Sequence, residues 1–196
     1  MPAPLLSKEE VLDRLLNTFR EKGYEGASLA ELSAATGLVK ASLYHYFPGG
    51  KQDMAEQVMA HLDRQLAAGL YAPLQSAQPP AKKLGAMLDA IDAFYEGGKK
   101  ACLYERLCAS VDRAQFQRPL RRAFATWVNA VESLCVEAGL SKAVARARAE
   151  DFVVRIEGAL IVCAGTGDCA VFARTLKDLR SSLLQVPAVP TRRART

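Results

Sequence analysis

The chain has 196 residues, of which 50% are hydrophobic and 24% are charged, a composition typical of a folded globular protein. Its longest apolar stretch, residues 159–164, is too short to span a bilayer core of ~30 Å, and the first residues lack the pattern of an export signal. These features exclude a membrane-spanning chain, and we expect a cytoplasmic protein without membrane partners.

The net charge of +5 is weak support for a nucleic-acid partner, because residues 1–64 carry seven bases against nine acids. Much of the basic surplus lies in residues 187–196, which we expect to form a disordered basic tail. The five cysteines are odd in number and contain no C-x-x-C pair, and His45 and His61 are not spaced as zinc ligands. We therefore expect no disulfide framework, no metal or other cofactor and, since no catalytic set stands out, no enzyme.

Three short helices are predicted near the N-terminus. The capping box Ser7-Lys8-Glu9-Glu10 begins the first, which Gly23 ends, and the box Ser28-Leu29-Ala30-Glu31 begins the second. The second ends near Gly37, and the third follows at once over Val39–Phe47. Two helices joined by a tight glycine turn predict a helix-turn-helix, whose last helix enters the DNA major groove. On that helix Lys40, Ala41, Tyr44 and His45 face outward.

The rest of the chain is also predicted to be helical, and no segment has the alternation of a strand. A longer helix over Lys51 to about Leu70 leads into further helices, which we place at Ala81–Glu96, Tyr104–Asp112, Pro119–Ala138, Lys142–Val162 and Asp168–Leu184. The predicted fold is all-α, with a helix-turn-helix domain over residues 1–50 and a helical ligand-binding and dimerisation domain over residues 51–186.

The last two helices carry more apolar residues than one small domain is expected to cover. These residues are Phe152, Val153, Ile156 and Leu160 in the first helix and Val171, Phe172, Leu176, Leu179 and Leu183 in the second. Gly158 and Ala159 would let a partner helix approach closely. We interpret the two helices as the interface of a homodimer, and the alternative is that the same residues form the core of one chain.

The N-terminal residues also resemble a known family. The run from Ser28 to Phe47, SLAELSAATGLVKASLYHYF, followed by Lys51, resembles the DNA-binding signature of TetR-family transcriptional regulators. The resemblance covers residues 8–60 closely and the remainder by its helical layout. The Phe-Pro-Gly-Gly-Lys turn is similar to that of a subgroup related to LmrA and YxaF, whereas Val39 stands where the family often has a capping Ser or Asn.

The resemblance implies a role for each matching residue. Side chains that would bind DNA phosphates are Ser28, Tyr44, Tyr46 and Lys51, and side chains that would face base edges are Val39, Lys40, Ala41 and His45. A purely structural alternative exists for several of them: Ser28 as a helix cap, the two tyrosines as packing residues, and Lys51 as a solvated charge.

The resemblance further implies a ligand pocket in the second domain. Candidate lining residues are Phe94, Tyr95, Cys102, Tyr104, Glu105, Phe116, Phe124 and Trp127, with Arg106 as a second charged anchor beside Glu105. Together they suggest a small apolar or aromatic effector, although each aromatic could equally be an ordinary core residue. Cys102 follows two lysines near a helix start, which favours a reactive thiolate. We hypothesise that it senses electrophiles or oxidants, with Cys108 as a second thiol, and the alternative is a buried inert thiol.

The sequence thus predicts a ligand-responsive repressor that releases a palindromic operator when a small molecule binds the C-terminal domain. One alternative is a cysteine-based redox or electrophile-sensing regulator. The other is a helical small-molecule-binding protein or enzyme that does not bind DNA.

Overall fold

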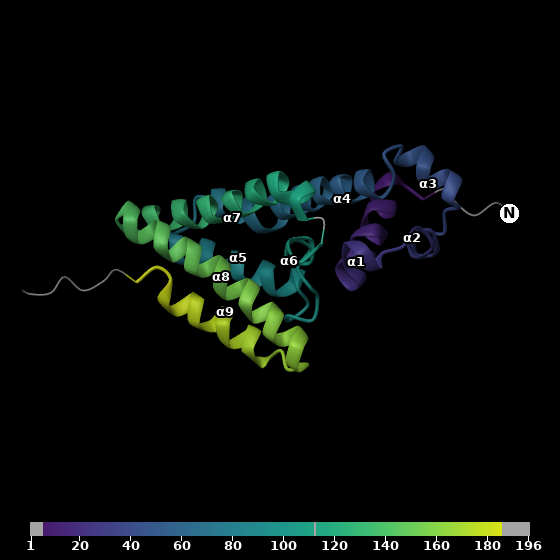
Figure 1. Cartoon of the computed structure of the whole chain (residues 1–196). Helices are drawn as coiled ribbons and strands as arrows, with labels where there is room; N and C mark the ends of the chain where they lie inside the picture. The colour runs from purple at the N-terminus through teal and green to yellow at the C-terminus, as the bar shows by residue number, and fades with distance from the viewer. Residues whose placement is uncertain (1–5, 112, 186–196) are drawn as a thin grey trace, which may run out of the picture.

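The computed structural model describes residues 6–111 and 113–185, and within these ranges the chain is all-α without strands, as predicted. The helices are α1 (Lys8–Gly26), α2 (Leu29–Thr36), α3 (Lys40–Tyr46), α4 (Gly50–Leu66), α5 (Pro80–Phe94), α6 (Leu103–Cys108), α7 (Gln117–Glu137), α8 (Lys142–Thr166) and α9 (Ala170–Ser182). Figure 1 shows α1–α3, which we call the head, at one end, and α5–α9, which we call the body, at the other, with α4 running between them. The tail predicted over residues 187–196 lies outside the described residues.

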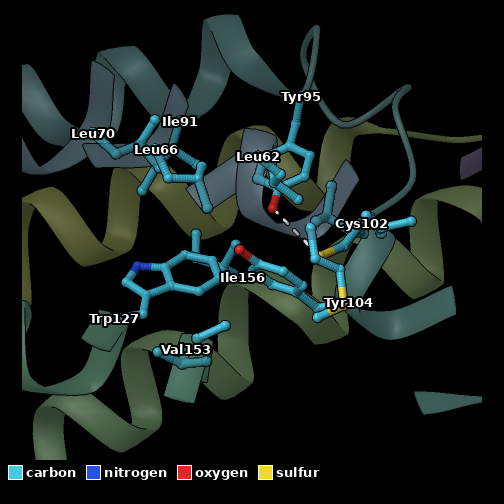
Figure 2. Packing of buried hydrophobic residues seen from close by; sticks show 14 of the residues in the cluster. Leu62, Leu66, Leu70, Ile91, Tyr95, Cys102, Tyr104, Trp127, Val153 and Ile156 are labelled. Atoms are coloured by element: carbon cyan, nitrogen blue, oxygen red, sulfur yellow. Dashed lines mark hydrogen bonds between the residues drawn. The ribbon is translucent and has the colours of Figure 1, made fainter. Parts of the chain in front are cut away.

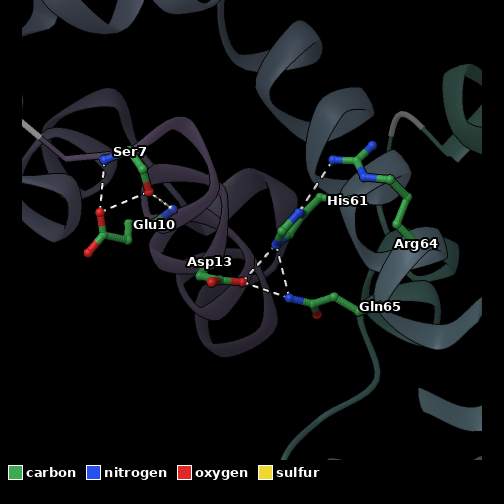
Figure 3. A network of polar contacts seen from close by, with 6 residues as sticks. All are labelled: Ser7, Glu10, Asp13, His61, Arg64 and Gln65. Carbon is green, nitrogen blue, oxygen red and sulfur yellow. Dashed lines mark hydrogen bonds and ion pairs between the residues drawn. The ribbon is translucent and has the colours of Figure 1, made fainter. Parts of the chain in front are cut away.

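Both predicted capping boxes are present. Ser7 Oγ accepts from the Glu10 amide at 3.2 Å while Glu10 Oε2 accepts from the Ser7 amide at 2.8 Å (Figure 3). Ser28 and Glu31 make the same pair of bonds at the start of α2. Hydrogen bonds from the serine backbone lower the pKa of both glutamates, since they stabilise the carboxylate. Gly23, at φ 70°, breaks the helical geometry of α1 as predicted, although one further turn follows to Gly26.

The head is fixed to α4 by a continuous core and by a polar network. Asp13 on α1 accepts from Gln65 of α4 at 2.8 Å and lies 2.7 Å from the ring of His61, which is buried (Figure 3). Further along, the Tyr104 hydroxyl of α6 donates to Asp63 of α4 at 2.6 Å. The orientation of the head is therefore set by side chains from both parts of the molecule.

The structure corrects the interpretation of the apolar stripes on the last two helices. Phe152, Ile156 and Phe172 are completely buried within one chain, and the other stripe residues except Val171 are also buried. The reason is that α7 packs along one side of α8 and α9 along another, so one chain covers far more apolar surface than expected (Figure 1). Figure 2 shows part of this core, where Val153 and Ile156 of α8 lie near Trp127 of α7. The buried stripe residues therefore belong to the core of one chain, which was the alternative interpretation.

Three local features differ from expectation. The predicted helix to Leu70 is regular only to Leu66 and continues as a π-helical turn over Ala67–Tyr71, and α8 runs beyond Val162 to Thr166, where Gly167 at φ 71° caps it. In addition, Cys163 at the end of α8 and Cys169 before α9 are joined by a disulfide, a single bridge that the odd cysteine count did not reveal.

Candidate nucleic-acid interface

The turn between α2 and α3 is rigidly built. Gly37 caps α2 in the left-handed region, at φ 71°, where a side chain would be strained. The hydroxyl of the buried Thr36 donates to the Leu32 carbonyl at 2.8 Å and accepts from the Leu38 amide at 3.3 Å. Because the Thr36 side chain bonds to backbone groups before and after the turn, the crossing of α3 over α2 is held by local bonds as well as by packing.

Helix α3 divides cleanly into a buried and an exposed face. Leu43 and the following Phe47 have no exposed surface, and they fix the helix to the core. The predicted base readers Val39, Lys40, Ala41 and His45 are all exposed, as is the predicted phosphate ligand Tyr44. Val39 and Tyr44 are 66% and 46% exposed, an unusual amount for large apolar side chains, and indicate a surface that a partner covers.

The other predicted phosphate ligands have partners within the chain. Ser28 is exposed, and its hydroxyl accepts the capping bond of α2. Tyr46 is half-buried beside Phe47. Lys51 Nζ donates to the Glu25 carbonyl at 3.3 Å and lies 4.6 Å from the centre of the Tyr24 ring, and burial lowers the pKa of this amine. Sequence reasoning missed this link to the end of α1, because no local pattern relates residues so far apart.

The surface around α3 favours an anionic partner. Lys40 and His45 are exposed on it, and residues 36–52 contain no acid. A helix with exposed donors and small groups, and no carboxylate to repel phosphates, is the arrangement that reads base edges in a major groove.

The predicted ligand-lining residues are distributed between the core and two cavities. Tyr95, Tyr104, Phe116 and Trp127 are buried in the core, and Phe94 is half-buried. Cys102, Glu105 and Arg106 line a cavity of about 310 Å³ between α6 and α8. Phe124 lines a second cavity, of about 360 Å³, together with residues from α6 to α7. Only part of the predicted ligand-lining set therefore lines a cavity.

The hypothesis of a reactive Cys102 is wrong in its physical basis. The thiol is buried, and the Tyr95 hydroxyl donates to its sulfur at 3.5 Å. Burial raises the pKa of Cys102 well above its ordinary value, which is the opposite of the effect expected from nearby lysines. Burial also raises the pKa of the more exposed Cys108. Cys102 therefore lacks the thiolate character on which the hypothesis depends.

A residue that sequence reasoning missed is Glu157 on α8. Both of its carboxylate oxygens are buried, and the Cys102 thiol is a polar group close to them. Burial raises its pKa to about 7 because the charged form loses its hydration. The sequence did contain a signal for its burial, because Glu157 follows the apolar Val153 by one helical turn and is next to the apolar Ile156.

We expect this shift to make stability fall as pH rises. A carboxyl whose pKa is raised in the folded state contributes most below its unfolded value near 4.5, and that contribution is lost as the group ionises towards pH 7. Between about pH 5 and pH 8, the free energy of unfolding of the wild type in urea should fall by about 2.5 kcal/mol relative to that of Glu157→Gln. The exposed Glu150→Gln is the control, and parallel curves for wild type and Glu157→Gln would contradict the expectation.

The described helices include none that is long and apolar enough to cross a membrane, and the described His, Cys, Asp and Glu side chains form no cluster suited to a metal ion.

Comparisons with known proteins bear on both parts of the chain. Residues 7–58 match the family described as bacterial regulatory proteins, tetR family, and residues 80–177 match the C-terminal domain of LmrA/YxaF-like transcriptional regulators. The HTH-type transcriptional regulator LmrA of Bacillus subtilis (strain 168) is 22% identical over 160 residues, which are 80% of this chain and 85% of that protein.

Solved structures share the fold. The crystal structure of a TetR transcriptional regulator from Legionella pneumophila has a TM-score of 0.81 at 19% identity, covering 92% of this chain and 98% of that one. A cysteine mutant of the TetR-family regulator CifR, complexed with 26-bp operator DNA, has a TM-score of 0.66 at 21% identity, covering 90% and 98%.

Proposed function

This chain belongs to the TetR family of bacterial regulatory proteins, as its N-terminal residues predicted, and from that premise we propose that it is a homodimeric repressor that releases a palindromic operator when a small molecule binds its body. The observation that carries the proposal is the exposed face of α3, which presents a lysine, a histidine and uncovered apolar side chains on a helix anchored by Leu43 and Phe47. We assign DNA reading to residues 1–50 and effector binding and dimerisation to residues 51–186.

Each protomer would place α3 in the major groove, with two half-sites about one helical turn, ~34 Å, apart. In this arrangement Val39, Lys40, Ala41 and His45 face base edges, and Lys40 can donate to guanine. Ser28, Tyr44, Tyr46 and Lys51 would contact phosphates, which dominate affinity without specifying sequence. The operator DNA in the CifR complex supports the same kind of partner for this chain.

The proposed dimer interface is the face of α8 that the chain itself leaves open. Val154 and Ile161 are 69% and 53% exposed, and Val162 lies beside them. A side chain at Gly158 would meet no atom of the same chain, so a partner helix has room to approach there. Three exposed branched residues around a glycine on one helix are suited to the isologous contact of a two-fold dimer.

The proposed effector is a small apolar or aromatic molecule bound in the body. The cavity lined by Leu120 and Phe124 offers an apolar wall, with Gln117 and Arg121 as polar groups. The effector weakens DNA binding only by as much as it prefers the conformation that does not bind DNA. As a member of a family of regulators the protein would act on DNA in the cytoplasm and would have no catalytic activity.

Selection of bound duplexes from a randomised DNA pool tests the proposal. The purified protein is expected to enrich one two-fold symmetric sequence, whose affinity falls steeply with salt because contacts of lysines with phosphates release counterions. Absence of any enriched sequence at low salt would overturn the proposed function.

On the selected duplex, Lys40→Ala is expected to lower affinity by about tenfold to a hundredfold and to relax the preference at one base pair of each half-site. The control Lys142→Ala removes an exposed lysine at the start of α8, far from the head, and should bind as the wild type does. Fluorescence anisotropy measures both. Equal DNA affinities for the two variants would show that Lys40 does not contact the operator.

A further inference from the structure

Arg20 of α1 is a buried cation without a counter-ion. Its side chain lies at the junction of head and body and is 5% exposed, and its Nε and Nη2 have no hydrogen-bond partner among the described residues. The guanidinium lies 4.6 Å from the centre of the Phe94 ring, a contact that offsets only part of the loss of hydration. Glu96, whose charge favours the guanidinium, is already paired with Lys100 at 2.7 Å. Burying such a charge costs free energy that the contacts within the described chain return only in part.

Arg20 lines a cavity of about 580 Å³, which is in the range of small-molecule sites. The cavity is bounded by α1, by the loop between α5 and α6, by α6 and by α8. Besides Arg20 it is lined by three further cations, Lys99, Lys100 and Arg106, and by two carboxylates, Glu21 and Glu96. Its apolar wall is formed by Leu160 and Ala164, which it shares with the adjoining cavity of about 310 Å³.

We propose that this cavity binds a small organic anion, with a carboxylate or phosphate group held by the guanidinium of Arg20 and the apolar part against Leu160 and Ala164. A guanidinium offers two parallel N–H groups to such an anion, and charge-assisted bonds of this kind are among the strongest available to a protein. Lys99 and Arg106 add positive charge from the opposite side of the junction. The anion supplies the partner that Arg20 lacks within the chain.

The location of the cavity allows a bound anion to affect the orientation of the head. Arg20 belongs to α1 of the head, whereas Lys99, Arg106 and Leu160 belong to the body, so a bound anion contacts both. Its affinity depends on their relative orientation, and by linkage it shifts that orientation. This regulatory part rests on the proposed function, whereas the binding site itself does not.

Calorimetric titration of the full-length protein without DNA tests the site, at constant ionic strength. The probes are benzoate, inorganic phosphate and neutral benzamide. Saturable binding of benzoate or phosphate, and none of benzamide at the same concentration, is the expected result; the stronger of the two anions identifies the acidic group. Arg20→Met should lower that affinity by about tenfold or more, and Arg118→Met, which removes an exposed arginine outside the cavity, should leave it unchanged.

Two further measurements keep the test decisive. Arg20→Met should unfold at the same or a higher temperature than the ligand-free wild type, because it removes an unpaired buried charge. Should that variant not fold, Lys99→Gln, at an exposed position, is expected to weaken anion binding by about threefold. Failure of both anions to bind, equal binding of benzamide, or retained anion affinity after Arg20→Met would overturn the proposal. If the protein bound benzoate but selected no DNA, the anion site would be supported and the proposed function would be refuted.

Discussion

Ile161→Glu is expected to separate the dimer into monomers and to lower the affinity for the two-fold symmetric operator by about a hundredfold or more. Ile161 lies in the exposed apolar face of α8, so in the dimer the new carboxylates would be buried next to each other. The large effect on DNA follows from geometry, since two linked heads bind a double site far more tightly than one head binds a half-site.

Sedimentation and DNA titration of the same preparation measure the two effects. The control Ala125→Glu places the same charge at an exposed position of α7, away from the proposed interface, and should leave a dimer with unchanged affinity. If Ile161→Glu remained dimeric and bound the operator as the wild type does, the proposed α8 interface would be refuted.

Phe47→Ala should have the largest effect on stability, about 3–5 kcal/mol in urea unfolding. Phe47 has no exposed surface, and its amide donates to the Leu43 carbonyl at 2.8 Å where α3 ends. Removing the ring leaves a cavity beneath the DNA-reading helix, so DNA affinity should fall together with stability. The control Val39→Ala, at an exposed position, should change stability by less than about 0.5 kcal/mol. A loss below 1 kcal/mol for Phe47→Ala, roughly the effect of an average substitution, would show that Phe47 does not anchor α3.

Local chemistry explains why much of the head is predictable from sequence. A serine and a glutamate three residues apart satisfy each other's backbone groups, so Ser7 and Ser28 identify the starts of α1 and α2 without knowledge of the fold. Gly37 identifies the turn for the same reason, because few other residues tolerate its backbone angles. The apolar Leu43 and Phe47, one turn apart, then indicate which face of α3 is buried, and Tyr44 lies on the opposite, exposed face.

The body is less predictable because its features depend on residues distant in sequence. The burial of the stripe that includes Phe152 and Phe172 requires the positions of α7 and α9, which periodicity does not supply. The environment of Cys102 is set by Tyr95 and by burial rather than by the adjacent lysines. Arg20 appears in sequence as an ordinary surface charge of an amphipathic helix, and only the packing of α1 against α6 reveals that it is buried and unpaired.

The central claim, that two α3 helices of a dimer read two half-sites of one operator, is tested most directly by scrambling one half of the selected duplex. Affinity is measured for the intact and half-scrambled duplexes over a range of salt concentrations. We predict that scrambling lowers affinity by about a hundredfold or more at moderate salt and reduces the salt dependence, because one head loses its specific phosphate contacts. Equal affinity and equal salt dependence for both duplexes would contradict the claim.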